Sequence, residues 1–211
     1  MFSTQTRLTI AGLVAWGLVS IGTAAAQNAP AAKDEKGKAP AAKVGEAAPE
    51  FALLDYAGKK VSLSQYKDKV VVLEWISPEC PWSRKVAPLT EALYKKYAAH
   101  GVVWLGIDST NWRKPEEVAK YVQEAKTPYP ILLDNDGRVG RAYGAKTTPH
   151  VFVIARGKLV YSGALHNDQQ GQKKPEDVRQ YLDEALAAVL ADKPVPLAET
   201  TPWGCGVKYK K

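Results

Sequence analysis

The stretch VVVLEWISPECPWSRK, from Val70 to Lys85, decides the fold that the sequence predicts. Its opening run, Val70–Trp75, is mostly apolar and rich in β-branched side chains, which is typical of a strand buried on both faces. Apolar residues then recur at helical spacing over 83–100. Cys80 therefore lies at a strand-to-helix turn. The chain contains only one other cysteine, Cys205, far along the sequence.

A cysteine at the start of a helix has a particular chemistry. Unpaired N–H groups give this end of a helix a partial positive charge, so a thiolate there is stabilised and its pKa falls. Ser83 lies three residues after Cys80, and its hydroxyl can donate a hydrogen bond to the thiolate. Arg84 and Lys85 add positive field, which Glu79 opposes. These residues favour a reactive cysteine over the alternative, a buried and inert one.

The N-terminus predicts export. Arg7 precedes an apolar stretch, Leu8–Ile21, and small residues follow it, which is the pattern of a signal peptide covering residues 1–26. The stretch is short and contains two glycines, so a retained membrane anchor is the weaker interpretation. We expect a periplasmic or secreted protein, with no membrane contact after cleavage. Export excludes nucleic acid as a partner despite a net charge of +7, and it allows disulfides to persist.

The rest of the chain divides into three parts. Residues 27–43 consist largely of Ala, Pro and Lys, which predicts a disordered linker. Residues 44–192 alternate between strand and helix patterns, which predicts one α/β domain with a central mixed sheet flanked by helices. A hairpin around Gly58 opens this domain. Residues 193–211 form a C-terminal tail that carries Cys205.

Periodicity and turn residues predict the elements that follow the first helix. The motif NDGR, at residues 135–138, is interpreted as a turn. In chain order the predicted elements are a strand at 102–108, a helix at 115–125, a strand at 129–134, a turn at 135–138, a hairpin of strands at 150–154 and 158–162, and a helix from 175 to about 191.

This order of elements resembles the thioredoxin superfamily over residues 44–192, and within it the redoxin or alkyl hydroperoxide reductase/thiol-specific antioxidant (AhpC/TSA) group. Three features carry the resemblance. The buried strand runs into a helix-start cysteine, Cys80. Thr148 and Pro149 precede a strand, where the superfamily places a cis-proline facing the reactive cysteine. The ending TTPWGCGVKYK is similar to the cysteine-bearing tail of peroxiredoxin-like bacterial exported proteins.

The resemblance implies thiol–disulfide oxidoreductase or antioxidant chemistry with Cys80 as the attacking thiolate. Glu74, six residues earlier, stands where thioredoxins hold a buried acid that helps move protons. Thr148 and Pro149 would hold the substrate backbone near the sulfur. Apart from the resemblance, Trp82 and Trp203 each lie within two residues of a cysteine, and they are candidates either for an apolar lip over the sulfur or for simple packing. The implied substrates are protein thiols and disulfides or peroxide, with a periplasmic thiol reductant. No cofactor and no metal are implied.

Cys205 is the candidate resolving cysteine. Gly204 and Gly206 flank it, so we expect the tail to swing, to form a disulfide with the oxidised form of Cys80, and to leave again. Two alternatives stay open. One is a static Cys80–Cys205 disulfide that fastens the tail, and the other is no bridge at all, with Cys205 forming dimers.

Two departures from the family pattern keep other functions open. Ser83 stands where thioredoxins have their second cysteine, and Leu73 stands where peroxiredoxins have the proline of P-x-x-x-T-x-x-C. A peroxiredoxin-like peroxidase and a non-enzymatic periplasmic binding module with a static disulfide are the alternatives. His150 follows Pro149 and can lie near Cys80, but one cysteine and one histidine make too small a ligand set for a metal.

Overall fold

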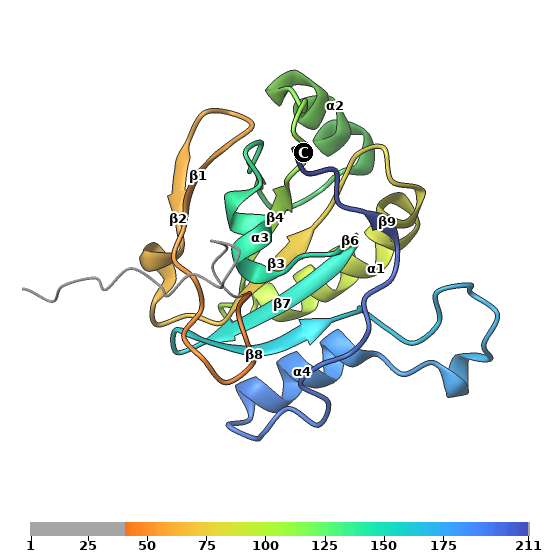
Figure 1. The fold of residues 1–211 in the computed structure, drawn as a ribbon. Coiled ribbons are helices and arrows are strands. Elements are labelled where there is room, and N and C mark those ends of the chain that lie inside the picture. Colours follow the sequence, from red (N-terminus) through yellow and green to blue (C-terminus); the bar gives the residue numbers. More distant parts are fainter. Residues whose placement is uncertain (1–40, 211) are drawn as a thin grey trace, which may run out of the picture. The chain divides into compact units, whose positions relative to one another are not determined.

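The computed structural model describes residues 41–210 and shows an α/β domain built on a mixed sheet (Figure 1). The predicted signal peptide and residues 27–40 of the predicted linker lie outside the described residues. The strands are β1 (Ala52–Asp55), β2 (Lys60–Ser62), β3 (Val71–Trp75), β4 (Val103–Asp108), β5 (Ile131–Leu133), β6 (Thr147–Thr148), β7 (His150–Ala155), β8 (Lys158–Gly163) and β9 (Cys205–Gly206). The helices are α1 (Pro81–Ala98), α2 (Pro115–Ala125), α3 (Arg138–Tyr143) and α4 (Tyr181–Leu190), with 3-10 turns at η1 (Leu63–Tyr66) and η2 (Pro175–Asp177).

Seven strands form the main sheet in the order β2-β1-β5-β4-β3-β7-β8. The central strands β3, β4 and β5 are parallel, whereas β1, β7 and β8 run antiparallel to their neighbours. The parallel strands need helical crossovers, and α1 and α2 supply them. The remaining two strands, β6 and β9, pair with each other in a small separate sheet. The predicted mixed sheet and N-terminal hairpin are confirmed.

β3 contributes to the core on both faces of the sheet. All five of its side chains are buried, and successive side chains of a strand point to opposite faces. Val71, Leu73 and Trp75 pack on one face with Tyr143 of α3. Val72 packs on the other face with residues of α1 and α4. The prediction of a strand buried on both faces is confirmed, and its end fixes where α1 begins.

One predicted helix begins later than expected, and one short helix was not predicted. The last helix begins at Tyr181 rather than at residue 175, because Arg179 pairs with Asn167 through its backbone N–H and carbonyl groups, which keeps it out of a helix. Residues 138–143 form the helix α3, which was not predicted, and only Arg138 of this helix belonged to the predicted turn at 135–138. The Asp134 carboxylate accepts backbone N–H groups at the start of this helix and stabilises it.

The tail predicted at 193–211 lies along the domain over its described length (dark blue in Figure 1). Before β9, the Thr200 N–H donates to the Ser162 carbonyl of β8 at 3.0 Å. After β9, the Tyr209 hydroxyl donates to the Ala145 carbonyl at 2.8 Å. The described helices include none that is both long and apolar enough to cross a membrane.

Adding a single methyl group at Gly163 should displace the tail from β8. A side chain at Gly163 would clash with the Thr200 hydroxyl and lie 2.7 Å from its carbonyl oxygen. We expect Gly163→Ala to destabilise the domain by about 1–3 kcal/mol through overpacking and to speed amide exchange at Thr200. Gly206→Ala is the control, because an added methyl there meets no atom within 4 Å. Unchanged exchange at Thr200 would show that the tail is held by other contacts.

Candidate active site

Cys80 joins the end of β3 to the start of α1. It is the N-cap residue of α1, with extended backbone angles, and Pro81 is the first helical residue. Its N–H donates to the Ser77 carbonyl at 3.0 Å, which closes the turn between the two elements. The side chain is 3% exposed. The sulfur therefore lies at the positive end of a long helix but has little contact with solvent.

Several donors surround the Cys80 sulfur. The thiol itself lies 2.9 Å from the Thr148 carbonyl oxygen and donates to it. Burial opposes ionisation, but hydrogen bonds from the Cys205 and Thr148 side chains and from the backbone N–H groups of Ser83 and Cys205 outweigh it. The pKa of Cys80 is therefore below the ordinary thiol value. The predicted reactive character of this cysteine has a physical basis in these contacts.

Cys205 lies directly beside Cys80. It pairs with Thr148 across the antiparallel β6–β9 pair, and both cysteines line the same cavity. Its side chain acts to lower the pKa of Cys80. The backbone N–H of Trp82 at the start of α1 acts to lower the pKa of Cys205. Burial, together with the hydrogen bond and the charge of Cys80, raises the pKa of Cys205. The structure thus brings the two cysteines together as free thiols, and their bridge stays a prediction.

Gly204 allows the tail to pack closely against Thr148 and does not leave it free to swing. Its φ of 137° is one that side chains rarely adopt, and an added Cβ would overlap the Thr148 carbonyl oxygen and lie 2.7 Å from the carbonyl carbon. The contacts of Thr200 and Tyr209 hold the tail on either side. In this structure Cys205 is held in place at the site.

Ser83 contributes differently from the expectation. Its hydroxyl accepts the N–H of Ser77 at 3.3 Å, inside the turn that precedes Cys80. The group of Ser83 that faces the Cys80 sulfur is its backbone N–H. The serine therefore supports the turn, and the helix backbone stabilises the thiolate.

Thr148 and Pro149 lie across from Cys80, as the resemblance implied. The peptide bond between them is cis, and the Thr148 carbonyl is the acceptor of the Cys80 thiol. Trp82 and Trp203 pack edge to face with ring centroids 5.9 Å apart, and the Trp203 indole N–H donates to the His166 carbonyl at 2.9 Å. The two tryptophans thus form one apolar wall beside the cysteines.

Glu74 is buried below this site and contacts neither cysteine directly. Its carboxylate accepts the Trp104 indole N–H at 2.9 Å and the Tyr129 hydroxyl at 2.8 Å. Burial raises the pKa of Glu74 to about 7, although both hydrogen bonds act in the other direction. The pKa of Tyr121 is raised to about 12 by burial and by the charges of both Glu74 and Cys80. Tyr121, which sequence reasoning missed, is thus electrostatically coupled to both groups.

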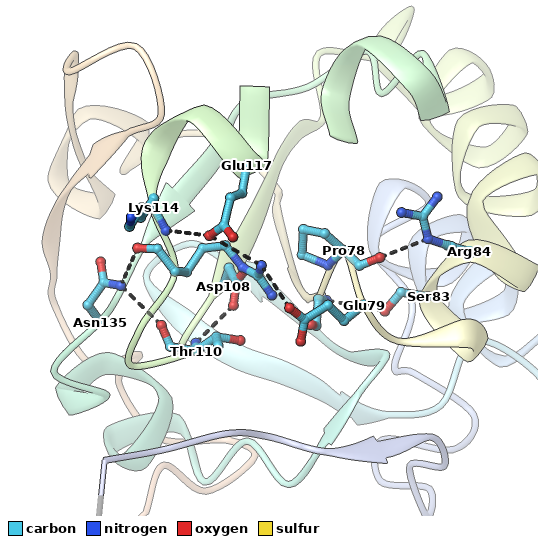
Figure 2. A network of polar contacts seen from close by, with 11 residues as sticks. Pro78, Glu79, Ser83, Arg84, Asp108, Thr110, Lys114, Glu117 and Asn135 are labelled. Carbon is cyan, nitrogen blue, oxygen red and sulfur yellow. Dashed lines mark hydrogen bonds and ion pairs between the residues drawn. The ribbon is translucent and has the colours of Figure 1, made fainter. Parts of the chain in front are cut away.

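A network of charged residues fixes the loop before Cys80 (Figure 2). The buried Arg113 donates to Asp108 at 3.0 Å and to Glu79 at 3.3 Å. Arg84 donates to the Pro78 carbonyl at 2.8 Å. The turn at 78–80 is therefore held from two sides. Sequence reasoning missed Arg113, because its spacing from Cys80 carries no motif.

A cavity of about 190 Å³ opens beside the two sulfurs. Polar groups from Ser77, Asp108 and Thr110 line it, together with both cysteines. Burial raises the pKa of Asp108, against hydrogen bonds from Thr110 and the charge of Arg113. The cavity therefore brings these polar groups and both cysteines to one space.

His150 does not join the cysteines. It is buried on β7, accepts the Lys146 N–H on Nδ1 at 3.2 Å and lies 3.3 Å from the Ser162 hydroxyl through Nε2. Burial and the nearby Lys146 lower its pKa to about 3. It is a neutral core residue. Across residues 41–210 no group of three or more His, Cys, Asp or Glu side chains is arranged to hold a metal ion.

The fold and the site together define a thioredoxin-like protein with a thiol at a helix start opposite a cis-proline. The chain belongs to the AhpC/TSA family, whose model matches residues 44–162. The predicted fold and family are thereby confirmed.

The relatives are thiol–disulfide oxidoreductases at low identity. The chain is 27% identical over 139 residues to the thiol-disulfide oxidoreductase ResA of Bacillus thuringiensis subsp. konkukian, covering 66% of this chain and 76% of that protein. It is 30% identical over 118 residues to ResA of Bacillus anthracis, covering 56% and 67%.

Solved structures agree with this placement. An uncharacterized conserved protein from Geobacillus kaustophilus superposes with a TM-score of 0.73 at 31% identity, covering 80% of this chain and 93% of that chain. A putative thiol:disulfide interchange protein DsbE from Chlorobium tepidum has a TM-score of 0.53 at 28% identity, covering 58% and 85%.

Glu74 should make stability depend on pH. Folding raises its pKa from 4.5 to about 7, so the folded chain retains a proton that the unfolded chain loses between these values. Stability should therefore fall as pH rises through this window, by about 3 kcal/mol in total. Glu74→Gln should lack this loss. Urea unfolding of the reduced proteins at a series of pH values measures the free energy of unfolding. If this free energy falls with pH equally in the wild-type and Glu74→Gln proteins, Glu74 is not the group responsible.

Cys205 should lower the pKa of Cys80. Cys205→Ala removes a thiol donor from the sulfur, so the pKa of Cys80 should rise. The pH dependence of Cys80 alkylation by iodoacetamide, located by peptide mass, measures the change. Gly206→Ala is the matched control on the same strand. An unchanged midpoint in the Cys205→Ala protein would show that the Cys205 thiol does not contribute to the pKa of Cys80.

Proposed function

We propose that this protein is a thiol–disulfide oxidoreductase whose redox pair is Cys80 and Cys205. The observation that carries the proposal is that strand pairing with Thr148 brings Cys205 to the start of α1, where both cysteines line one cavity. Thr148 and Trp82 position Cys205 through strand pairing and a backbone N–H. The pair needs no cysteine at position 83, because the tail supplies the second thiol.

The two cysteines have different electrostatic environments. The pKa of Cys80 is lowered and that of Cys205 is raised, so Cys80 is the nucleophile. Its thiolate attacks one sulfur of a substrate disulfide, the substrate S–S bond breaks, and the other substrate sulfur leaves as a thiolate. Cys205 then loses its proton and attacks the Cys80 sulfur. The Cys80–Cys205 disulfide forms, the second substrate thiolate leaves, and two electrons have passed to the substrate.

The surrounding residues have supporting roles. The Ser83 N–H stabilises the thiolate. Thr148 and Pro149 present backbone to a substrate beside the sulfur, and Trp82 provides an apolar surface. Glu74, with a pKa near neutrality, exchanges the proton that each cycle requires. These assignments apply the family's chemistry to the contacts of this chain.

We also propose that the reaction takes place outside the cytoplasm. The charged start, apolar stretch and small residues of 1–26 support export. The substrates are then protein disulfides, with peroxide as the other candidate oxidant. A periplasmic dithiol protein returns the pair to its reduced form.

Thiol trapping followed by intact mass tests the redox pair. We expect the reduced protein to bind two alkyl groups, and the protein treated with a disulfide or with peroxide to bind none. Mild reductant should restore both. Cys205→Ser should stop at a stable mixed disulfide on Cys80, whereas Cys80→Ser should form none.

Three results would contradict the proposal. Thiols that stay free after every oxidant would leave a binding module with the fold but without redox activity. A bridge that resists reductant until the protein unfolds would identify a static disulfide. Closure with peroxide at rates far above those with disulfides would identify a peroxidase instead.

A further inference from the structure

β6 is a two-residue strand whose only strand partner among residues 41–210 is β9. It ends at Thr148, directly before Pro149 and directly across from Cys80. An unpaired edge of this kind would present free N–H and carbonyl groups. Here the chain's own tail covers it, with Cys205 opposite Thr148.

Gly204 shows how closely the tail fits this edge. Its Cα lies so near the Thr148 carbonyl that an added Cβ would overlap the oxygen and lie 3.0 Å from the Pro149 nitrogen. At Gly206, on the same strand, an added Cβ would meet no atom within 4 Å. The edge therefore demands glycine immediately before the paired cysteine and leaves the position after it open.

Trp203 is the side-chain anchor of the tail. Its indole packs edge to face on Trp82 at 5.9 Å and on His166 at 5.0 Å, and its N–H donates to the His166 carbonyl at 2.9 Å. Trp203 is half-buried, so this is an aromatic site on the domain surface rather than part of the core. A flat aromatic ring that carries an N–H donor fits this surface site.

Backbone pairing at a sheet edge combined with a side-chain site is how proteins recognise extended peptides by strand addition. We propose that Thr147, Thr148, Trp82 and the His166 carbonyl, here called the β6 edge, bind an extended peptide with the pattern aromatic–glycine–cysteine. The residues Trp203–Cys205 are its resident occupant, and polypeptide partners of the redox reaction carry the same pattern. This inference rests on the proposed function and adds a substrate class to it.

The resident occupant competes with every such partner. It is part of the same chain, and the contacts of Thr200 and Tyr209 hold it from outside the edge. Intramolecular attachment gives it a high effective concentration, so an external peptide gains access only when the tail leaves. Loosening the tail should therefore raise the rate of peptide capture.

Peptide capture by Cys80 tests this directly in full-length protein. All variants carry Cys205→Ser, so Cys80 is the only thiol. Two isomeric peptides, TPWGCAV and TPWACGV, each carry their cysteine as a disulfide with thionitrobenzoate. The Cys80 thiolate attacks the peptide sulfur, a Cys80–peptide disulfide forms, and coloured thionitrobenzoate leaves. Absorbance gives the rate, and intact mass confirms the adduct.

We compare the tail-intact protein with Gly204→Ala, which should displace the tail from Thr148, and with Gly206→Ala, which should not. Gly204→Ala should capture TPWGCAV about tenfold faster or more, while Gly206→Ala matches the tail-intact rate. In the Gly204→Ala protein, TPWGCAV should also react about tenfold faster than TPWACGV. Trp203→Ala, which removes the anchor without a backbone clash, replaces Gly204→Ala if that variant does not fold.

The outcomes separate this inference from the proposed function. Equal rates for the two peptides in the loosened protein, with normal reaction of Cys80 toward free dithionitrobenzoate, overturn the β6-edge proposal and leave the redox function standing. No reaction of Cys80 with any disulfide overturns both. A preference for TPWGCAV that appears only when the tail is loosened supports the proposal.

Discussion

The pairing of Thr148 with Cys205 is the contact on which the candidate site depends. It places a thiol from the end of the chain beside Cys80, which lies at the end of β3. The Thr148 carbonyl also accepts the Cys80 thiol and is the atom against which Gly204 fits. One peptide group therefore positions both cysteines. Without this pairing, α1 would carry a single buried thiol, which has no local route to release a mixed disulfide.

The same contact gives the two thiols different pKa values. An N–H from the first turn of α1 acts to lower the pKa of each sulfur, that of Ser83 for Cys80 and that of Trp82 for Cys205. The difference arises because the Cys205 thiol donates to Cys80. A donor stabilises the thiolate that receives it and holds its own proton more tightly, so the two pKa values move apart. The helix start serves both sulfurs, and in the proposed reaction the difference between their pKa values makes Cys80 the nucleophile.

Local sequence signals predicted the frame of the site and missed its long-range contacts. The buried strand, the helix-start cysteine and the Thr148–Pro149 turn are each visible within a few residues, because periodicity and proline act locally. The hydrogen bonds of Thr200 and Tyr209 hold the tail against the domain, and they depend on where β8 and α3 lie in space. No local sequence pattern contains that information. The glycines beside Cys205 were interpreted as freedom, whereas Gly204 is required by a close approach.

A second thiol on a tail rather than on the helix changes what limits turnover. A cysteine at position 83 would move with the first, and a substrate could approach both from the β6 side. Here the segment that supplies the second thiol also covers the strand edge beside Cys80. In the proposed reaction, substrate entry requires the tail to leave, and resolution of a mixed disulfide requires it to return. The strength of the tail's anchors must therefore be intermediate, because tighter anchors would slow entry and weaker ones would slow resolution.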